Sequence, residues 1–201
     1  MTVKLSSTSS SLSTPRALVL DAWRGGASVL MIIYHFCYDL NYFKMVAFDF
    51  SNQFFWLGFR AVIVILFVGI VGISLHLTTV NGLRVHAFLK RLMILVCCAI
   101  LISIISAVLF KTRFIFFGIL HFIALASALG LLFIRWFWFN LFGGLSLLVI
   151  GIKMQHPWFN YPVLQWVGLM TYKPPTEDYV PLLPWFGIVL LGLFVGKSLH
   201  Q

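Results

Sequence analysis

Long apolar runs follow one another along the 201 residues of the chain, separated by short polar stretches. An α-helix needs about 20 apolar residues to cross a bilayer. Runs of this kind predict six spanning helices, at residues 26–45, 54–80, 90–110, 114–134, 136–154 and 182–199. The pattern therefore predicts an all-α fold, a polytopic membrane helical bundle with about six transmembrane helices.

Two stretches fall outside these helices. Residues 1–15 are polar and Ser-rich, and they lack the apolar core of a signal peptide, so we expect a polar tail. Residues 16–201 are then a single transmembrane domain. The segment 155–181 holds five of the seven prolines. Its apolar piece, Val163–Tyr172, is too short to span, and we expect it to be interfacial or re-entrant.

Composition supports a membrane protein. The chain is 61% hydrophobic and 9% charged, with a mean hydropathy of +1.02, which excludes a soluble domain. The net charge of +9 comes from Lys and Arg residues scattered at helix ends. There they would meet lipid phosphates, so the charge predicts membrane lipids as partners and no nucleic acid. The three cysteines lie in apolar runs, without the spacing of a disulfide or metal site.

Basic residues in short loops set the orientation of a membrane protein. With the N-terminus inside, the cytoplasmic set has eight members, Lys4, Arg16, Arg24, Arg84, Lys90, Arg91, Arg135 and Lys197. The opposite set has six, Lys44, Arg60, Lys111, Arg113, Lys153 and Lys173. The bias predicts that both termini face the cytoplasm.

The first apolar stretch carries four ionisable side chains, Asp21, Arg24, His35 and Asp39. Ionisable residues are costly within lipid, so they suggest function. Ten residues separate Arg24 from His35. Eleven helical steps turn about 20° past three full turns and advance about 16.5 Å, so the two side chains share one face. We expect that face to point into the bundle, with Arg24 near one surface and His35 deep.

Asp39 follows His35 by four residues, and a carboxylate so placed can orient an imidazole that acts as a general base. Asp21 and Arg24 are neighbours one turn apart. The alternative carries equal weight on spacing alone: Arg24 snorkels to headgroups, Asp21 caps the helix, and His35 forms a hydrogen bond within the bundle.

Two further segments carry candidate chemistry. Arg113 and His121 lie close together in the sequence around Gly118, and either they line a pocket or they serve as an interfacial anchor and a packing contact. Asp178 and Trp185 lie at the entrance to the last helix. They form either a lip that contacts a polar substrate or a rigid loop with an interfacial tryptophan.

The residues also carry a resemblance. The segments Leu20–Leu40, Val68–Ser74, Phe117–Leu125 and Asp178–Gly187 resemble signatures of the bacterial heparan-alpha-glucosaminide N-acetyltransferase catalytic-domain-like membrane proteins. The spacing of Arg24 and His35 is also similar to the acyltransferase family 3 motif of the transmembrane acyltransferase superfamily. The resemblance extends over most of the chain, from about residue 16 to residue 197.

The resemblance implies an acyl-CoA-dependent membrane acyltransferase of the bacterial inner membrane. It would transfer an acetyl or acyl group from acyl-CoA, such as acetyl-CoA, to a glycan or other envelope acceptor, without a metal. His35 matches the catalytic histidine, and Arg24 matches the motif arginine. With Asp39 orienting His35, we expect Arg24 and Arg113 to bind the donor, and Asp21, His121, Asp178 and Trp185 to line the pocket. A homo-oligomer is compatible with this function.

Two other classes remain open. A transporter or accessory subunit could use the buried His, Asp and Arg side chains as a proton relay, and it would show proton-coupled flux without thioester turnover. A purely structural subunit would tolerate Gln or Asn in place of His35.

Overall fold

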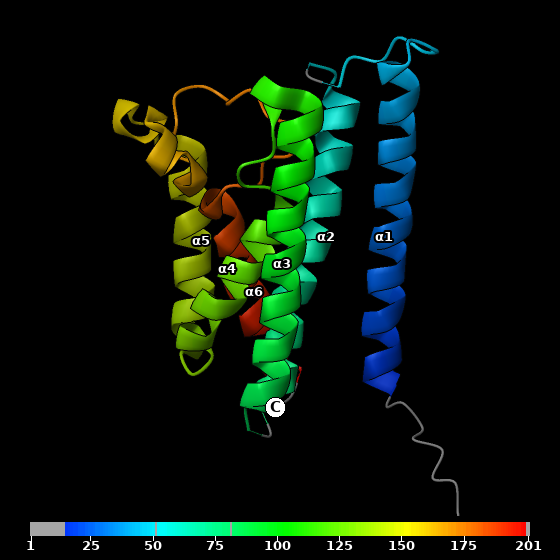
Figure 1. The fold of residues 1–201 in the computed structure, drawn as a ribbon. Coiled ribbons are helices and arrows are strands. Elements are labelled where there is room, and N and C mark those ends of the chain that lie inside the picture. Colours follow the sequence, from blue (N-terminus) through cyan, green and yellow to red (C-terminus); the bar gives the residue numbers. More distant parts are fainter. Residues whose placement is uncertain (1–14, 51, 81, 200–201) are drawn as a thin grey trace, which may run out of the picture. The chain divides into compact units, whose positions relative to one another are not determined.

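The computed structural model describes residues 15–50, 52–80 and 82–199 (Figure 1). The polar tail predicted for residues 1–15 lies almost wholly outside them. The described residues form six α-helices, three short 3-10 helices and no strand, which confirms the all-α prediction for this part of the chain. The elements are α1 (Pro15–Tyr42), α2 (Phe54–Thr79), α3 (Val85–Phe110), η1 (Lys111–Arg113), α4 (Ile119–Phe133), α5 (Phe137–Lys153), η2 (Pro157–Asn160), η3 (Pro162–Val167) and α6 (Leu182–Ser198).

The chain divides into two compact units. Unit 1 is Met1–Ala47 and contains α1, and unit 2 is Phe48–Gln201 and contains every later helix. In unit 1, α1 begins at Pro15, well before the predicted residue 26. The prediction left out residues 15–25 because Asp21 and Arg24 interrupt the apolar run there. In the structure these two side chains form an ion pair of 2.9 Å one helical turn apart, which is compatible with a helix.

In unit 2, α6 packs against α2, α4 and α5. Figure 1 shows the start of α2, the end of α3 and the segment between α5 and α6 at one end of this unit. We call this the loop-rich end, residues 111–118 and 154–181. The turns after α2 and α4 and the end of α6 lie at the opposite end, where Lys197 Nζ donates to the carbonyl oxygen of Arg135 at 3.3 Å. We call it the basic end, residues 82–91, 134–137 and 195–199.

Small residues allow the backbones of unit 2 to come close. A Cβ on Gly72 would lie 2.9 Å from Cα of Gly192, and a Cβ on Gly144 would lie 2.9 Å from the carbonyl oxygen of Gly187. Close backbone approach of this kind favours helix association within membranes. Around these contacts lie fully buried side chains from α2, α4 and α6, namely Val68, Phe122, Ala126, Val189 and Leu193.

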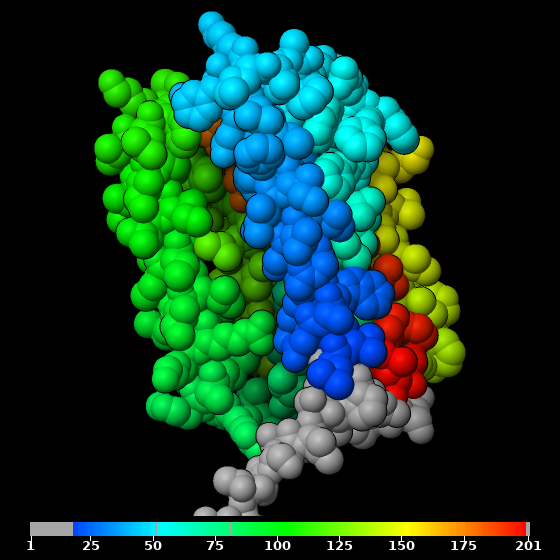
Figure 2. Space-filling view, turned by 90° about the vertical axis from the view of Figure 1, so that its right-hand side faces the viewer, coloured from blue at the N-terminus to red at the C-terminus, as the bar shows by residue number. Residues whose placement is uncertain are grey.

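Two stretches of the described residues are long and apolar enough to cross a membrane, Phe54–Thr79 and Val85–Arg113. Much of α3 is exposed along its length in the space-filling view (Figure 2), as lipid contact requires. α4, α5 and α6 have 15, 17 and 17 residues. At 1.5 Å per residue they extend about 22–26 Å, less than the ~30 Å hydrocarbon core. Six complete spans therefore stay a prediction.

The start of α4, beside the loop-rich end, differs from the prediction. α4 begins at Ile119, five residues after the predicted start, because Phe114–Gly118 is held in an extended path by residues 176–180. Val163–Tyr172 forms no long helix, and most of η3 falls within it.

Candidate functional site

α1 is one uninterrupted helix through Arg24 and His35, so the phase argument for a shared face applies directly to the structure. Arg24 Nη1 donates to Asp21 Oδ1 at 2.9 Å, and the Ser28 hydroxyl donates to the carbonyl oxygen of Arg24 at 2.9 Å. The ring of His35 meets Tyr34 edge-on, with centroids 5.9 Å apart. That this face points into the bundle stays a prediction.

Asp39 lies one turn beyond His35, at the last part of α1. Within the described residues, no hydrogen bond joins its carboxylate to the imidazole. Catalytic hydrogen bonds are often long before substrate binds and tighten in the complex. The orienting role of Asp39 therefore stays a prediction, and the helix supplies the spacing for it.

His121 lies in a hydrogen-bond network at the start of α4. Its Nδ1 accepts from the backbone N–H of Gly118 at 3.3 Å, and its Nε2 lies 3.1 Å from Ser103 Oγ. The Ser103 hydroxyl donates to the carbonyl oxygen of Ile115 at 2.7 Å, so it accepts from Nε2. This assignment gives a neutral imidazole with both nitrogens engaged. The geometry favours a packing role for His121 over proton transfer.

Ser103 is a residue that the sequence analysis missed. Ser106 contacts the same residue, since its hydroxyl accepts from the backbone N–H of Ile115 at 2.9 Å. The available signal was two serines three residues apart in the long apolar stretch that follows Arg91, because polar side chains of this kind mark helix contacts in membranes.

We expected Asp178 to line a substrate pocket. In the structure it also makes a contact that supports the start of α4. Its Oδ2 accepts from the backbone N–H of Ile119 at 2.7 Å, at the first residue of α4. The Thr176 hydroxyl donates to the carbonyl oxygen of Phe114 at 2.8 Å. A carboxylate at a helix N-terminus satisfies an otherwise unpaired donor and complements the helix dipole. Asp178 thus fixes where α4 begins.

We expect Asp178→Ala to destabilise the protein by about 0.5–2 kcal/mol, the usual loss for an N-cap carboxylate. Thermal unfolding in detergent checks this result. The matched control is Asp49→Ala, which removes a carboxylate that serves a local loop contact with Asn52. Equal stability losses in the two variants would contradict the capping role.

Arg113 ends the 3-10 turn after α3 and pairs with Glu177, with Arg113 Nε 3.0 Å from Glu177 Oε1. The backbone N–H of Glu177 also donates to the carbonyl oxygen of Arg113 at 3.2 Å. The guanidinium is half-exposed and the carboxylate is mostly buried. The pair joins residues 111–113 to 173–180, and the donor-binding role predicted for Arg113 stays a prediction.

Lys173 is a second residue that the sequence analysis did not single out. Partial burial lowers the pKa of Lys173, and the positive charges of Arg60 and Arg113 lower it further, while Asp178 and Glu177 oppose this. Arg60 of α2 and Arg113 of η1 therefore act on Lys173 of the last loop. The amine is neutral over a wider pH range than an ordinary lysine.

Both Lys173 and Lys153, at the end of α5, have exposed side chains. The lowered pKa of Lys173 predicts that acetic anhydride acylates it faster than Lys153. Deprotonated amine is the reactive form, so the advantage should grow as the pH falls from 9 toward 7. Peptide mapping after brief labelling measures both rates. Equal acylation rates of Lys173 and Lys153 across this range would contradict the lowered pKa of Lys173.

Trp185 lies in the first turn of α6, partly buried against the core of unit 2. Nearby, the Tyr179 hydroxyl donates to the carbonyl oxygen of Gln165 at 2.6 Å, and burial raises the pKa of Tyr179. Tyr179 therefore stays neutral and ties the last loop to η3.

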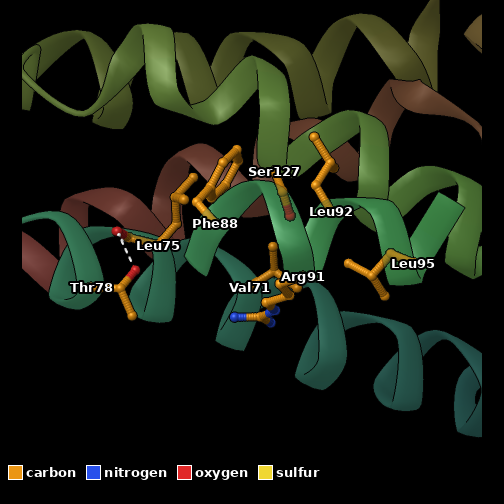
Figure 3. A pocket seen from close by; sticks show the side chains of 8 residues that line it. All are labelled: Val71, Leu75, Thr78, Phe88, Arg91, Leu92, Leu95 and Ser127. Carbon is orange, nitrogen blue, oxygen red and sulfur yellow. Dashed lines mark hydrogen bonds between the residues drawn. The ribbon is translucent and has the colours of Figure 1, made fainter. Parts of the chain in front are cut away.

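Two of the hollows among the described residues of unit 2 bear on the chemistry of the chain. A cavity of about 30 Å³ lies between α2, α3 and α4, with Ser127 and Arg91 in its lining (Figure 3). An open groove of about 700 Å³ runs along α4, α5 and α6. The groove is lined by apolar and aromatic side chains with one serine, so it offers no general base for acyl transfer.

Among the described residues, no group of three or more His, Cys, Asp or Glu side chains is placed to hold a metal ion. No curated protein and no solved structure matches the chain significantly. The family described as heparan-alpha-glucosaminide N-acetyltransferase, catalytic, matches residues 16–201. This range contains α2–α6 and all but the first residue of α1, including every candidate side chain discussed above. The resemblance seen in the sequence is therefore confirmed, and the chain belongs to this family of membrane-associated, acetyltransferase-type enzymes.

Proposed function

We propose that the chain is an integral membrane acyltransferase of the bacterial inner membrane. It takes an acetyl or acyl group from acyl-CoA and transfers it to a glycan or other cell-envelope acceptor. The observation that carries this proposal is the uninterrupted α1, which holds Arg24 and His35 on one face within a chain of this family. A cation and an imidazole about 16.5 Å apart suit an anionic donor that reaches a reaction centre deep in the membrane.

In this mechanism His35 accepts the proton from an acceptor hydroxyl or amine. The acceptor oxygen or nitrogen attacks the thioester carbonyl carbon, and the carbon–sulfur bond breaks. The CoA thiolate leaves and takes up the proton that His35 carries. Positioned proton transfer of this kind contributes about 10²–10⁴ in rate. A two-step route through an acyl group on His35 satisfies the same balance of atoms.

The other side chains have supporting roles. Asp39 stabilises the protonated form of His35, and Arg24, paired with Asp21 at 2.9 Å, faces the donor's phosphates. Arg113 and Asp178 belong to the loop-rich end, and His121 and Trp185 lie in the first turns of α4 and α6. The hydrogen bonds of His121 and Asp178 favour a rigid wall there over direct chemistry.

Release of free CoA thiol by the purified protein tests this function. With acetyl-CoA as donor, we expect thiol release that depends on an added amino sugar or sugar hydroxyl. The same protein in proteoliposomes, loaded with a pH-sensitive dye, tests for proton flux. Proton-coupled flux without thiol release would favour the transporter function instead.

A further inference from the structure

The open groove of about 700 Å³ follows α5 between α4 and α6, and the proposed acyl transfer does not use it. It starts with Phe133 and Trp138 beside the basic end and reaches Leu147, ten residues beyond Phe137, the first residue of α5. At 1.5 Å per residue this length is about 15 Å, half of the ~30 Å hydrocarbon core. The groove therefore covers about the depth of one leaflet.

The lining of the groove suits an acyl chain. Phe142 of α5 and Phe186 and Leu190 of α6 are among its apolar walls, and Ser146 and the indole of Trp138 are its polar groups. No charged side chain is among the lining residues. An empty groove would lose dispersion contacts along its walls. In a bilayer, hydrocarbon chains are the material that can restore these contacts.

Two exposed tryptophans and an arginine lie where the groove begins. Trp136 and Trp138 are 60% and 64% exposed at the start of α5, and exposed tryptophans favour the level of the lipid headgroups. The ring of Trp136 meets the ring of Phe139, a lining residue, with centroids 5.6 Å apart. Arg135 precedes Trp136 in the turn between α4 and α5 and is exposed. The turn that carries Arg135 therefore adjoins the groove.

The acidic side chains of unit 2 lie at the end away from this arginine. They are Asp49, before α2, and Glu177 and Asp178, before α6. Figure 1 shows both of these segments opposite the turn between α4 and α5. Lys197 adds a second cation beside Arg135, because its Nζ donates to the carbonyl oxygen of Arg135 at 3.3 Å. The two cations complement an anionic headgroup, and we predicted that they face the cytoplasmic leaflet, whose surface is negative.

We propose that the groove is a binding site for an anionic phospholipid of the leaflet that meets the basic end. One acyl chain lies in the groove against Phe142 and Leu190. The phosphate pairs with the guanidinium of Arg135, whose planar donors match phosphate oxygens. Lys197 contributes positive charge at the same place. The ligand is a lipid and not an acyl donor, so the proposal is independent of the proposed acyl transfer.

Quenching of tryptophan fluorescence tests the place of the acyl chain. The purified protein is reconstituted in phosphatidylcholine bilayers that contain a small fraction of phosphatidylglycerol with brominated acyl chains. A parallel sample contains the same fraction of brominated phosphatidylcholine. The chain has seven tryptophans, so Trp138→Phe shows which part of the quenching comes from Trp138.

Ser146→Phe places a ring in the groove, and Leu145→Phe is its matched control at an exposed position of the same helix outside the lining. We expect brominated phosphatidylglycerol to quench Trp138 more than brominated phosphatidylcholine does. Ser146→Phe should remove this excess, and Leu145→Phe should keep it. Circular dichroism checks that each variant is folded.

Arg135→Gln tests the headgroup. Its matched control is Lys153→Gln, which removes an exposed cation from the other end of α5. We expect Arg135→Gln to lower the affinity for phosphatidylglycerol relative to phosphatidylcholine about fivefold, since one basic residue near the surface contributes about this much attraction. Lys153→Gln should leave the relative affinity unchanged.

Two results would overturn the proposal. Equal quenching of Trp138 by the two brominated lipids in the wild type would show that the groove does not select an anionic lipid. Quenching that Trp138→Phe does not reduce would show that lipid chains do not enter the groove, as when another protein segment covers it. These measurements need no acetyl-CoA, so they stand whether or not acyl transfer is found.

Discussion

Replacement of His35 by alanine is expected to lower the rate of acyl transfer about 10²–10⁴-fold, because the general base is lost. The protein should still insert and fold, since the helix that carries His35 is continuous on both sides of it. Steady-state release of CoA thiol at saturating acetyl-CoA measures the loss. Asp39→Asn should reduce the rate less, because its carboxylate orients the imidazole and does not take the substrate proton. Arg24→Ala should mainly raise the KM for acetyl-CoA.

His86→Ala is the matched control for His35→Ala. His86 is an exposed histidine near the start of α3, outside the proposed reaction centre. Its variant should keep near-normal turnover. Near-normal turnover by a folded His35→Ala protein would falsify the assigned mechanism and favour the transporter or structural function.

Replacement of Gly72 by alanine is expected to destabilise the protein by about 1–3 kcal/mol or more, the cost of overpacking. A Cβ at Gly72 would lie 2.9 Å from Cα of Gly192 and from the backbone nitrogen of Leu193, and would also contact the carbonyl oxygen of Val189. These are backbone atoms of α6, which cannot move aside as a side chain can. Thermal unfolding in detergent, followed by light scattering, measures the effect.

Gly58→Ala on the same helix is the control. A Cβ at Gly58 meets nothing within 4 Å, and alanine favours a helix over glycine by up to about 1 kcal/mol. This variant should therefore be neutral or slightly more stable. A Gly72→Ala protein as stable as Gly58→Ala would show that α2 and α6 do not pack closely at Gly72.

Helix positions were predictable because the length of a run of apolar residues can be read from a short stretch of sequence. The predicted stretches at 54–80 and 182–199 agree closely with α2 and α6, and both contain glycines that the structure uses for close packing. The start of α4 was not predictable from a window of sequence. Its cap, Asp178, lies 59 residues further along the chain, and only the fold brings it to Ile119.

The candidate site was predictable in part for the same reason. The shared face of Arg24 and His35 follows from helical phase alone. The hydrogen bonds of His121 depend on Ser103 and Ile115 in neighbouring segments. The sequence around His121 therefore did not indicate which groups it would contact. The environment of Lys173 likewise depends on burial within the fold and on the charges of Arg60 and Arg113, which are distant in sequence.

Transfer of a labelled acetyl group tests the central proposal most directly. Purified wild-type protein and folded His35→Ala protein are incubated with acetyl-labelled CoA and glycans extracted from the cell envelope, and the label is followed to its acceptor. We expect the label to move to the glycan with the wild type and to stay in acetyl-CoA with His35→Ala. Label that never leaves acetyl-CoA with the wild type, or that moves equally with both proteins, would contradict it.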